Sequence, residues 1–372
     1  MSAAAAGIDT ATVLDTFLRL VRIDSPSGDE AALIAALEPE LRRLGFEVWR
    51  DTPGNLLARR PGRGSTAGAA PLIFSAHLDT VEPGRGIDAR VEDGVVRSDG
   101  TTILGADDKA GIAAILEGVR AADAGGADGP CRPLELILTV EEETGLIGAK
   151  GLDVDSLKGR QAIVLDSDGP VGKIVNQAPA ADLVDAVVTG KAAHAGVAPE
   201  EGINALVATA RALAEMRPRR IDAETTANFG VFSGGSAVNV VPEHVELKGE
   251  ARSRSEDRLQ AQSAHMAQRL RDAAAAVGAT ADVTVTRAYG SIDLPPTSPL
   301  IRFVEDAMRA CGLEPFLAPT GGGSDANIFN AAGIETVNLG TGYRGAHSVD
   351  EHIAVADLGT LTGLVRALIT AP

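Results

Sequence analysis

Short apolar runs that end in polar, metal-binding residue types constrain this fold more than any other feature of the sequence. Residues 71–74 form one such run, and the following segment 75–80 (SAHLDT) carries His77 and Asp79. The pattern predicts a buried strand that delivers two polar side chains at its carboxyl end. Because side chains two positions apart on a strand share a face, the His77 imidazole can bind a metal ion while the Asp79 carboxylate orients it. Alone, such a pair is more often a hydrogen-bonded strand end.

Three further places in the chain repeat this arrangement. A predicted strand at 134–140 runs into three consecutive glutamates, a predicted strand at 162–165 runs into Asp166 and Asp168, and Asp107 and Asp108 stand where a helix begins. Taken singly, the Asp107–Asp108 pair suits a helix N-cap and the glutamates suit a solvated turn. Open sheets place their sites at the carboxyl ends of strands, so four such clusters in one chain favour a shared site.

The order of predicted elements indicates an α/β fold. Strands alternate with helices before residue 165 and again from 299 to 369, which predicts a mixed or mostly parallel sheet covered by helices on both faces. Residues 181–291 instead follow a strand-helix-strand-strand-helix-strand order, typical of a ferredoxin-like α+β domain. We therefore expect a catalytic domain in two parts, 1–180 and 292–372, that carries 181–291 as an inserted domain.

Composition narrows the classes of partner. Lys and Arg number 34 against 51 Asp and Glu, so the net charge of -17 disfavours nucleic acid and anionic membranes as partners. Cys131 and Cys311 show neither metal-type spacing nor a disulfide framework. The N-terminal residues lack the basic region of a signal peptide, and no apolar run approaches transmembrane length. These observations predict a cytoplasmic protein.

The residue types in the clusters indicate the chemistry of the site. Carboxylates with two histidines, His77 and His347, and no cysteine suit a zinc, cobalt or manganese pair better than a structural zinc, which prefers thiolates. Two metal ions roughly 3.5 Å apart that share a carboxylate would lower the pKa of a water between them from about 15.7 toward about 7. A carboxylate that binds no metal must accept the proton, and the adjacent Glu142 and Glu143 can divide the tasks of base and ligand.

These clusters resemble the motifs of the co-catalytic zinc metallopeptidase family that contains peptidase T, aminoacylase, glutamate carboxypeptidase and succinyl-diaminopimelate desuccinylase. The resemblance covers nearly the whole chain, in order, and rests on His77-x-Asp79, residues 105–109 (GADDK), 142–145 (EETG), Asp166, Ala193-His194 and His347. Each motif is modest alone, whereas six in sequence with matching spacing are specific. The resemblance implies a zinc-exopeptidase catalytic domain whose insert serves as a lid or dimerisation domain.

The resemblance also implies a role for each matching residue. The implied metal ligands are His77 and Asp166 on the first ion, Glu143 and His347 on the second, and Asp107 as a bridge between them. Glu142 resembles the general base, and Asp79 resembles the acid that orients the ligand histidine. Asp168 is an alternative to Asp166 as a ligand.

The insert carries three further candidates. His194 resembles a lid histidine that helps to hold the scissile carbonyl, often across a dimer interface, and imidazole is a suitable oxyanion partner. Asn239 and Arg252 match lid positions that bind substrate, since an Arg fork suits a carboxylate. A purely structural role, with Asn239 in a turn and Arg252 at the surface, accounts for these two residues about equally well. A homodimer through the insert is in keeping with the resemblance.

The resemblance thus predicts a metal-dependent exopeptidase that uses two divalent ions, zinc foremost, to hydrolyse short peptides. The aspartate at 166 and the GADDK form of 105–109 favour the peptidase T branch, a tripeptide aminopeptidase. Alternatives on the same metal site are a carboxypeptidase and a non-peptidase amidohydrolase of N-acyl amino acids. A catalytically silent metal-binding scaffold protein is a rival of another class, but such a site needs no free base and Glu142 supplies one.

Overall fold

The computed structural model of the chain describes residues 7–126, 128–216 and 219–371. These residues form two compact units. Unit 1 contains the residues up to Asn176, Leu294–Pro319 and those from Ser324 onward, whereas unit 2 contains Gln177–Asp293 and Thr320–Gly323. The segment 181–291 lies within unit 2, which extends a few residues beyond it at each end and takes in Thr320–Gly323 from a later part of the chain.

The main sheet has nine strands in the described part of the chain, and its centre is parallel. The strands are β1 (Glu47–Arg50), β2 (Leu56–Arg60), β3 (Leu72–His77), β6 (Leu134–Thr139), β7 (Gln161–Ser167), β8 (Lys173–Ala178), β13 (Ile292–Asp293), β14 (Phe316–Pro319) and β15 (Glu335–Gly340). Their order is β1-β2-β6-β3-β7-β15-β8-β13, with β14 beside β8. The pairs of β3 with β6, β3 with β7, and β7 with β15 are parallel.

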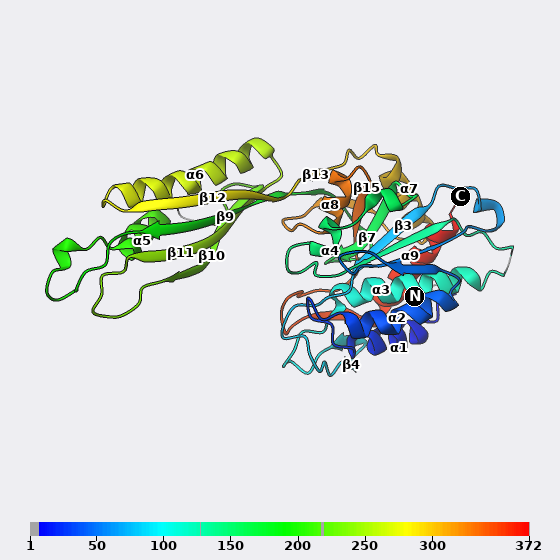
Figure 1. The fold of residues 1–372 in the computed structure, drawn as a ribbon. Coiled ribbons are helices and arrows are strands. Elements are labelled where there is room, and N and C mark those ends of the chain that lie inside the picture. The colour runs from blue at the N-terminus through cyan, green and yellow to red at the C-terminus, as the bar shows by residue number, and fades with distance from the viewer. Residues whose placement is uncertain (1–6, 127, 217–218, 372) are drawn as a thin grey trace. The chain divides into compact units, whose positions relative to one another are not determined.

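Helices cover both faces of this sheet, as Figure 1 shows. The helices of unit 1 are α1 (Thr10–Val21), α2 (Ala31–Arg43), α3 (Ala106–Asp123), α4 (Ile147–Lys150), α7 (Pro299–Ala310), α8 (Asp325–Ala331) and α9 (Val355–Thr370). Helix α3 packs on β3 and β7 together with α1 and α9, and α8 packs with α4 on the other face of β7 and β15. Every residue of β3 and β6 is buried, because strands covered on both faces need continuous rather than alternating apolar sequence.

A second, smaller sheet pairs segments that are distant in sequence. Strands β4 (Arg90–Glu92) and β5 (Val95–Arg97) form a hairpin around residues 93–94, whose two turn residues have positive φ. Strand β16 (His352–Ala354) adds to β5 in antiparallel register. The segment that precedes α9 is therefore fixed beside this hairpin.

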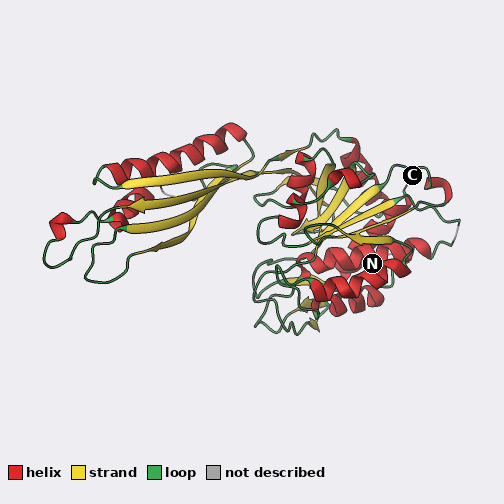
Figure 2. Cartoon of the chain, viewed as in Figure 1, coloured by secondary structure: helices red, strands yellow, loops and turns green. Residues whose placement is uncertain are grey.

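Unit 2 has the ferredoxin-like order of elements. Its elements are β9 (Ala180–Thr189), α5 (Ala205–Met216), β10 (Thr225–Gly234), β11 (His244–Ser253), α6 (Glu256–Ala275) and β12 (Thr280–Tyr289). Within its described residues the four strands are ordered β10-β11-β9-β12, and every neighbouring pair is antiparallel. Helices α5 and α6 cover one face of this sheet (Figure 2). The core beneath them includes Val184 and Leu247. The alternation of exposed and buried residues in β9 follows from this one-sided packing.

Some elements departed from the sequence-based expectation. Helix α8 was not predicted, because it spans only Asp325–Ala331 and follows three glycines. A capping box starts it, in which Ser324 and Asn327 exchange side-chain and backbone hydrogen bonds. Strand β8 was also not predicted. Among the helices of the described residues, none combines the length and the apolar character that a membrane crossing requires.

Candidate active site

The candidate site lies at one edge of the main sheet, where its parallel strands end. His77 is the last residue of β3, the three glutamates at 141–143 begin two residues after the end of β6, and Asp166 lies near the end of β7. Because β6, β3 and β7 are parallel, these ends meet at one edge. Asp107 from the start of α3 and His347 from the segment between β15 and β16 join them. The structure therefore brings the polar clusters of the sequence together.

One group of candidate ligands consists of His77, Asp107 and Asp166. His77 Nε2 lies 3.0 Å from Asp107 Oδ1 and 3.8 Å from Asp166 Oδ1. The ligand atoms of the three residues all lie within 4.8 Å of one another. One imidazole nitrogen and two carboxylates at this spacing can hold a divalent cation.

A second group consists of Asp107, Glu143 and His347. His347 Nε2 lies 2.9 Å from Glu143 Oε1 and 3.5 Å from Asp107 Oδ2. Asp107 thus presents Oδ1 to the first group and Oδ2 to the second. A carboxylate that offers one oxygen to each of two neighbouring groups has the geometry to bridge two metal ions.

Asp79 contacts both the candidate ligand His77 and the glutamates that follow β6. The Nδ1 atom of His77 lies 2.9 Å from the backbone oxygen of Asp79 and 3.5 Å from Asp79 Oδ1, which leaves Nε2 facing the carboxylates. The Asp79 carboxylate also accepts the backbone N–H groups of Glu142 and Glu143 at 2.9 and 3.1 Å, and the Ser27 hydroxyl at 2.6 Å. One buried carboxylate therefore orients the histidine and the glutamate turn together.

Glu142 has the properties of a free base. Its side chain is buried, and it has neither a hydrogen-bond nor an ion-pair partner among the residues that the structure describes. Its ligand atoms nevertheless lie within 4.8 Å of those of His77 and Glu143. Burial raises the pKa of Glu142 well above its ordinary value, and the negative charges of Asp325 and Glu143 add to this effect. A raised pKa suits a carboxylate that must accept and release a proton near neutral pH.

The charges of the cluster are unbalanced without a cation. Burial raises the pKa of Asp166 well above its ordinary value, and the charge of Asp107 raises it further. Burial lowers the pKa of His77, but hydrogen bonds with Asp107 and Asp79 raise it well above 6.5 overall. A hydrogen bond with Asp107 is the largest of the effects that raise the pKa of His347 to about 10. The candidate ligands are thus three carboxylates, Asp107, Asp166 and Glu143, and two imidazoles, and this donor set fits hard or borderline divalent ions.

Asp107 and Asp108 do not act as helix caps. The N-cap position of α3 is Gly105, at φ 72°, and both aspartates depart from helical dihedral angles. Asp108 is fully buried; its Oδ2 accepts the backbone N–H of His77 at 3.2 Å, while Oδ1 has no hydrogen-bond partner in the described part of the chain. The N-cap interpretation of this pair is therefore wrong for this chain, and Asp108 supports the end of β3.

The structure distinguishes the two acids after β7. Asp166 lies in the first ligand group and accepts a hydrogen bond from Tyr343 at 3.4 Å between Oδ1 and the phenol oxygen. Asp168 is exposed and pairs with Lys173 at 2.8 Å. Asp166 rather than Asp168 therefore faces the other candidate ligands.

Three buried residues beside the site have side-chain roles that the sequence did not indicate. Tyr343 approaches Asp166, Asp325 accepts the Thr139 hydroxyl at 2.5 Å, and the Glu351 carboxylate accepts backbone N–H groups at the start of α3. Glu351 and Asp107 are 244 residues apart in sequence, so no local pattern links them. For Asp325, the only signal was its place after the glycine run at 321–323.

The insert candidates lie in unit 2. His194 is exposed, and its Nδ1 accepts the Gly196 backbone N–H at 3.1 Å. The segment that carries it pairs with the segment that carries Asn239, because the backbone oxygen of Asn239 accepts the N–H of Ala195 at 2.9 Å. His194 and Asn239 thus belong to one loop pair within this unit. Their substrate-binding roles stay predictions.

Arg252 has an intramolecular partner. Its Nε and Nη2 atoms donate to the two carboxylate oxygens of Glu250 at 3.0 and 2.9 Å. This bidentate pair occupies the Nε and Nη2 side of the guanidinium, and its Nη1 donors take no part in the pair. The substrate-binding role of Arg252 stays a prediction.

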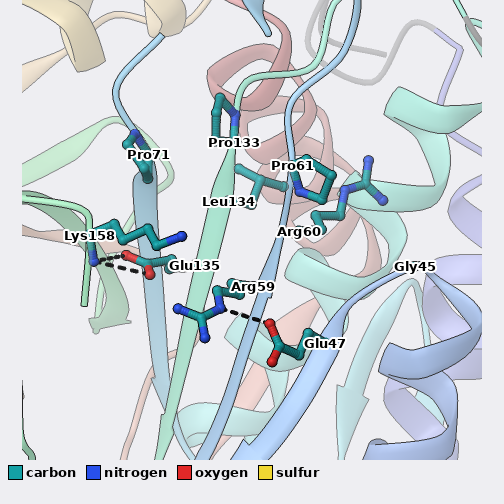
Figure 3. Close-up of a pocket in the computed structure, with 10 residues that line it drawn as sticks. All are labelled: Gly45, Glu47, Arg59, Arg60, Pro61, Pro71, Pro133, Leu134, Glu135 and Lys158. Carbon is teal, nitrogen blue, oxygen red and sulfur yellow. Dashed lines mark hydrogen bonds and ion pairs between the residues drawn. The ribbon is translucent and has the colours of Figure 1, made fainter. Parts of the chain in front are cut away.

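A separate cavity of about 310 Å³ lies in unit 1, at the sheet edge where β3 and β6 begin (Figure 3). The Glu135 carboxylate there accepts the N–H groups of Lys158 and Gly159, and Arg59 donates to Glu47. The acidic groups of this cavity are thus engaged with their neighbours. The cavity lies at the opposite strand ends from His77, so it is distinct from the candidate site.

Comparison with known proteins assigns the family. The profile of peptidase family M20/M25/M40 matches residues 73–371. The crystal structure of the aminopeptidase PepT from Bacillus cereus is 40% identical, covers 98% of both chains and superposes with a TM-score of 0.87. A tripeptidase from Staphylococcus aureus is 36% identical, covers 98% of both chains and gives a TM-score of 0.91. The uncharacterised protein YqjE of Bacillus subtilis is 39% identical over 365 residues, 96% of this chain and 97% of its own. This chain therefore belongs to peptidase family M20/M25/M40 and is a hydrolytic peptidase.

Proposed function

We propose that this peptidase is a metal-dependent aminopeptidase of the peptidase T type that removes the N-terminal residue of tripeptides. The main support is the position of Asp107, whose two oxygens face two separate ligand groups, with the free carboxylate of Glu142 close by. The similarity to an aminopeptidase and to a tripeptidase over nearly the whole chain favours this substrate class.

Two divalent ions would be held by the two ligand groups. His77, Asp107 and Asp166 would bind one ion, and Asp107, Glu143 and His347 the other, with Asp107 as the bridge. The donor set of imidazoles and carboxylates favours zinc, with cobalt or manganese as alternatives. Such ions supply Lewis acidity toward the scissile carbonyl and the attacking water.

The side chains of the protein carry the proton transfers. Glu142 would accept a proton from the attacking water on a carboxylate oxygen and deliver it to the leaving amine. Asp79 would hold the Glu142 backbone and the His77 ring during this step through the hydrogen bonds described above. His194 would donate a hydrogen bond to the developing oxyanion, and Asn239 and Arg252 would bind the peptide.

A substrate panel tests the proposal. An aminopeptidase of tripeptides should cleave free tripeptides and C-terminally amidated tripeptides but not N-acetylated tripeptides. A carboxypeptidase would show the reverse preference for blocked ends. Turnover of N-acyl amino acids alone would identify a non-peptidase amidohydrolase. No turnover of any substrate by protein loaded with two metal equivalents would favour the scaffold alternative.

We also infer a cytoplasmic location and a homodimer that forms through unit 2, with a small peptide as the substrate. The net charge of -17 supports the absence of nucleic acid and anionic membranes among its partners. Light scattering coupled to size-exclusion chromatography would give the oligomeric state directly. A monomer at micromolar concentration would contradict the dimer.

A further inference from the structure

Glu351 is a buried carboxylate that spans two segments of the candidate site. Its side chain lies in unit 1 and the residue is 1% exposed. Its Oε2 accepts the backbone N–H groups of Leu104 at 2.8 Å and Gly105 at 2.7 Å, and its Oε1 accepts that of Asp107 at 2.9 Å. Both carboxylate oxygens are therefore engaged by the backbone that leads into α3.

These hydrogen bonds provide most of the free energy that offsets the loss of hydration of the buried Glu351 carboxylate. The buried Lys109 of α3 donates its ammonium group to the backbone oxygen of Ile23 at 2.7 Å rather than to Glu351. A buried carboxylate that lacks a direct ion pair requires hydrogen bonds to offset its loss of hydration. Conversely, the three backbone N–H groups would be left unsatisfied if Glu351 were replaced by an apolar residue. The carboxylate and the α3 start thus depend on each other.

The segment that carries Glu351 is itself compact. Arg344 and His352 exchange two backbone hydrogen bonds of 2.9 Å, which close the loop that contains His347. Gly345, at φ 71°, lies against the backbone of residues 350 and 351, where an added Cβ would stand 3.1 Å from the Asp350 oxygen. Glu351 and His347 thus belong to one loop that is closed by backbone hydrogen bonds.

We propose that Glu351 is a positioning residue that sets the separation between Asp107 and His347, and thereby the affinity of the second metal site. The backbone N–H that it binds belongs to Asp107, and the loop that it anchors carries His347, whose Nε2 lies 3.5 Å from Asp107 Oδ2. This inference rests on the proposed two-metal function. Outer residues that orient ligands typically contribute about 10–100-fold to metal affinity.

Three variants test this role. Glu351→Gln keeps the size of the side chain but points an amide donor toward backbone donors, and Glu351→Asp keeps the charge but shortens the reach. Asp350→Asn is the matched control, because it removes the same charge one residue away from an exposed side chain. Zinc binding to chelator-treated protein is measured by competition with a chromophoric chelator, together with kcat, KM and the thermal midpoint of the metal-free protein.

The substitution at Glu351 should affect the second zinc equivalent more than the first. Glu351→Gln should weaken binding of the second zinc equivalent about 10–100-fold and that of the first by clearly less, because Asp107 serves both ligand groups whereas His347 serves only the second. Its kcat should fall with little change in KM and should recover in excess zinc, whereas Asp350→Asn should match the wild type. Glu351→Asp should lie between them, and it provides the test if Glu351→Gln does not fold.

Two outcomes would overturn the inference. Unchanged affinity for both equivalents would show that Glu351 does not position the second site. Equal weakening of both equivalents with a lowered thermal midpoint would show a general structural role. Failure of the wild type to bind two equivalents is distinguishable from both, because it contradicts the proposed function and removes the second site before Glu351 is considered.

Discussion

The Asp79 carboxylate accepts the backbone N–H of Glu142 at 2.9 Å, which links the support of the ligand histidine to the position of the proposed base. The same carboxylate accepts the N–H of Glu143. Motifs from the ends of two neighbouring strands, β3 and β6, are thus held by one side chain. Changes at position 79 should for this reason affect metal binding and proton transfer together.

Replacement of Asp79 by Ala should lower metal affinity about 10–100-fold and reduce kcat, with a smaller effect on KM. The reason is that the variant loses the carboxylate that holds the glutamate turn and flanks His77. Equilibrium competition with a chelator gives the affinity, and initial rates on a tripeptide give kcat and KM. Ser27→Ala is the matched control, since it removes only the 2.6 Å hydrogen bond to Oδ2. Unaltered metal affinity in Asp79→Ala would refute the supporting role.

Glu142→Gln should leave about two metal equivalents bound while it lowers kcat by roughly 10²–10⁴. The amide cannot accept the proton of the attacking water, whereas both proposed ligand groups remain complete. Glu141→Gln is the control, because it makes the same change one residue away at a residue outside the ligand groups. Full activity in Glu142→Gln, or loss of metal from it, would rule out the assigned role.

Removal of metal should abolish activity, and zinc, cobalt or manganese should restore it. The clustered acids lose their compensating charge in the chelated protein, so added metal should also raise the thermal midpoint. At a free metal concentration 100 times Kd, the stabilisation is about 2.7 kcal/mol per site. Activity and thermal unfolding are followed during titration of the chelated protein. Activity that survives complete chelation would eliminate the metal-dependent proposal.

The metal-free protein should lose stability as the pH rises from about 5 to about 8. Burial raises the pKa of Asp166 and of Glu142, and neighbouring carboxylates raise the pKa of His347 to about 10. In this window the folded state therefore binds more protons than the unfolded state, and proton release favours unfolding. Urea unfolding at several pH values gives the slope. Glu142→Gln should show a shallower slope, whereas a slope of opposite sign would contradict the charge assignment.

His194→Ala should lower kcat by roughly 10²–10³ if this residue stabilises the oxyanion. His265→Ala is a suitable control, because that exposed histidine belongs to α6 and matches no motif. Steady-state kinetics on one tripeptide compares the two variants. An unchanged kcat in His194→Ala would exclude an oxyanion role for this residue.

The sequence was most informative where chemistry and local pattern coincide. The buried strands β3 and β6 are continuous apolar runs because helices cover both faces, and the ligand types stand directly at their ends. The chain order of strands and helices was enough to predict the ferredoxin-like unit. Local patterns therefore predicted the fold class and the residues that gather around Asp107.

The remainder of the site depends on contacts between segments that are distant in sequence. The hydrogen bonds of Glu351 to the start of α3, and of Asp79 to the turn after β6, join positions that share no local period. Helix α8 was missed because a capping box, rather than apolar periodicity, starts it after a glycine run. The partner of the Arg252 fork, Glu250, was equally unforeseen, although it lies only two residues away.

The long segment Gln177–Asp293 of unit 2 begins and ends at paired positions. Ala178 pairs with Ile292 and Gln177 with Asp293, and Leu294 donates its N–H to the oxygen of Asn176 at 2.9 Å. The ends of a segment of more than one hundred residues are thus as close as the ends of a hairpin. This segment could therefore be exchanged, resized or replaced by a short turn, in evolution or by design. The order of the strands that carry the candidate ligands would not change.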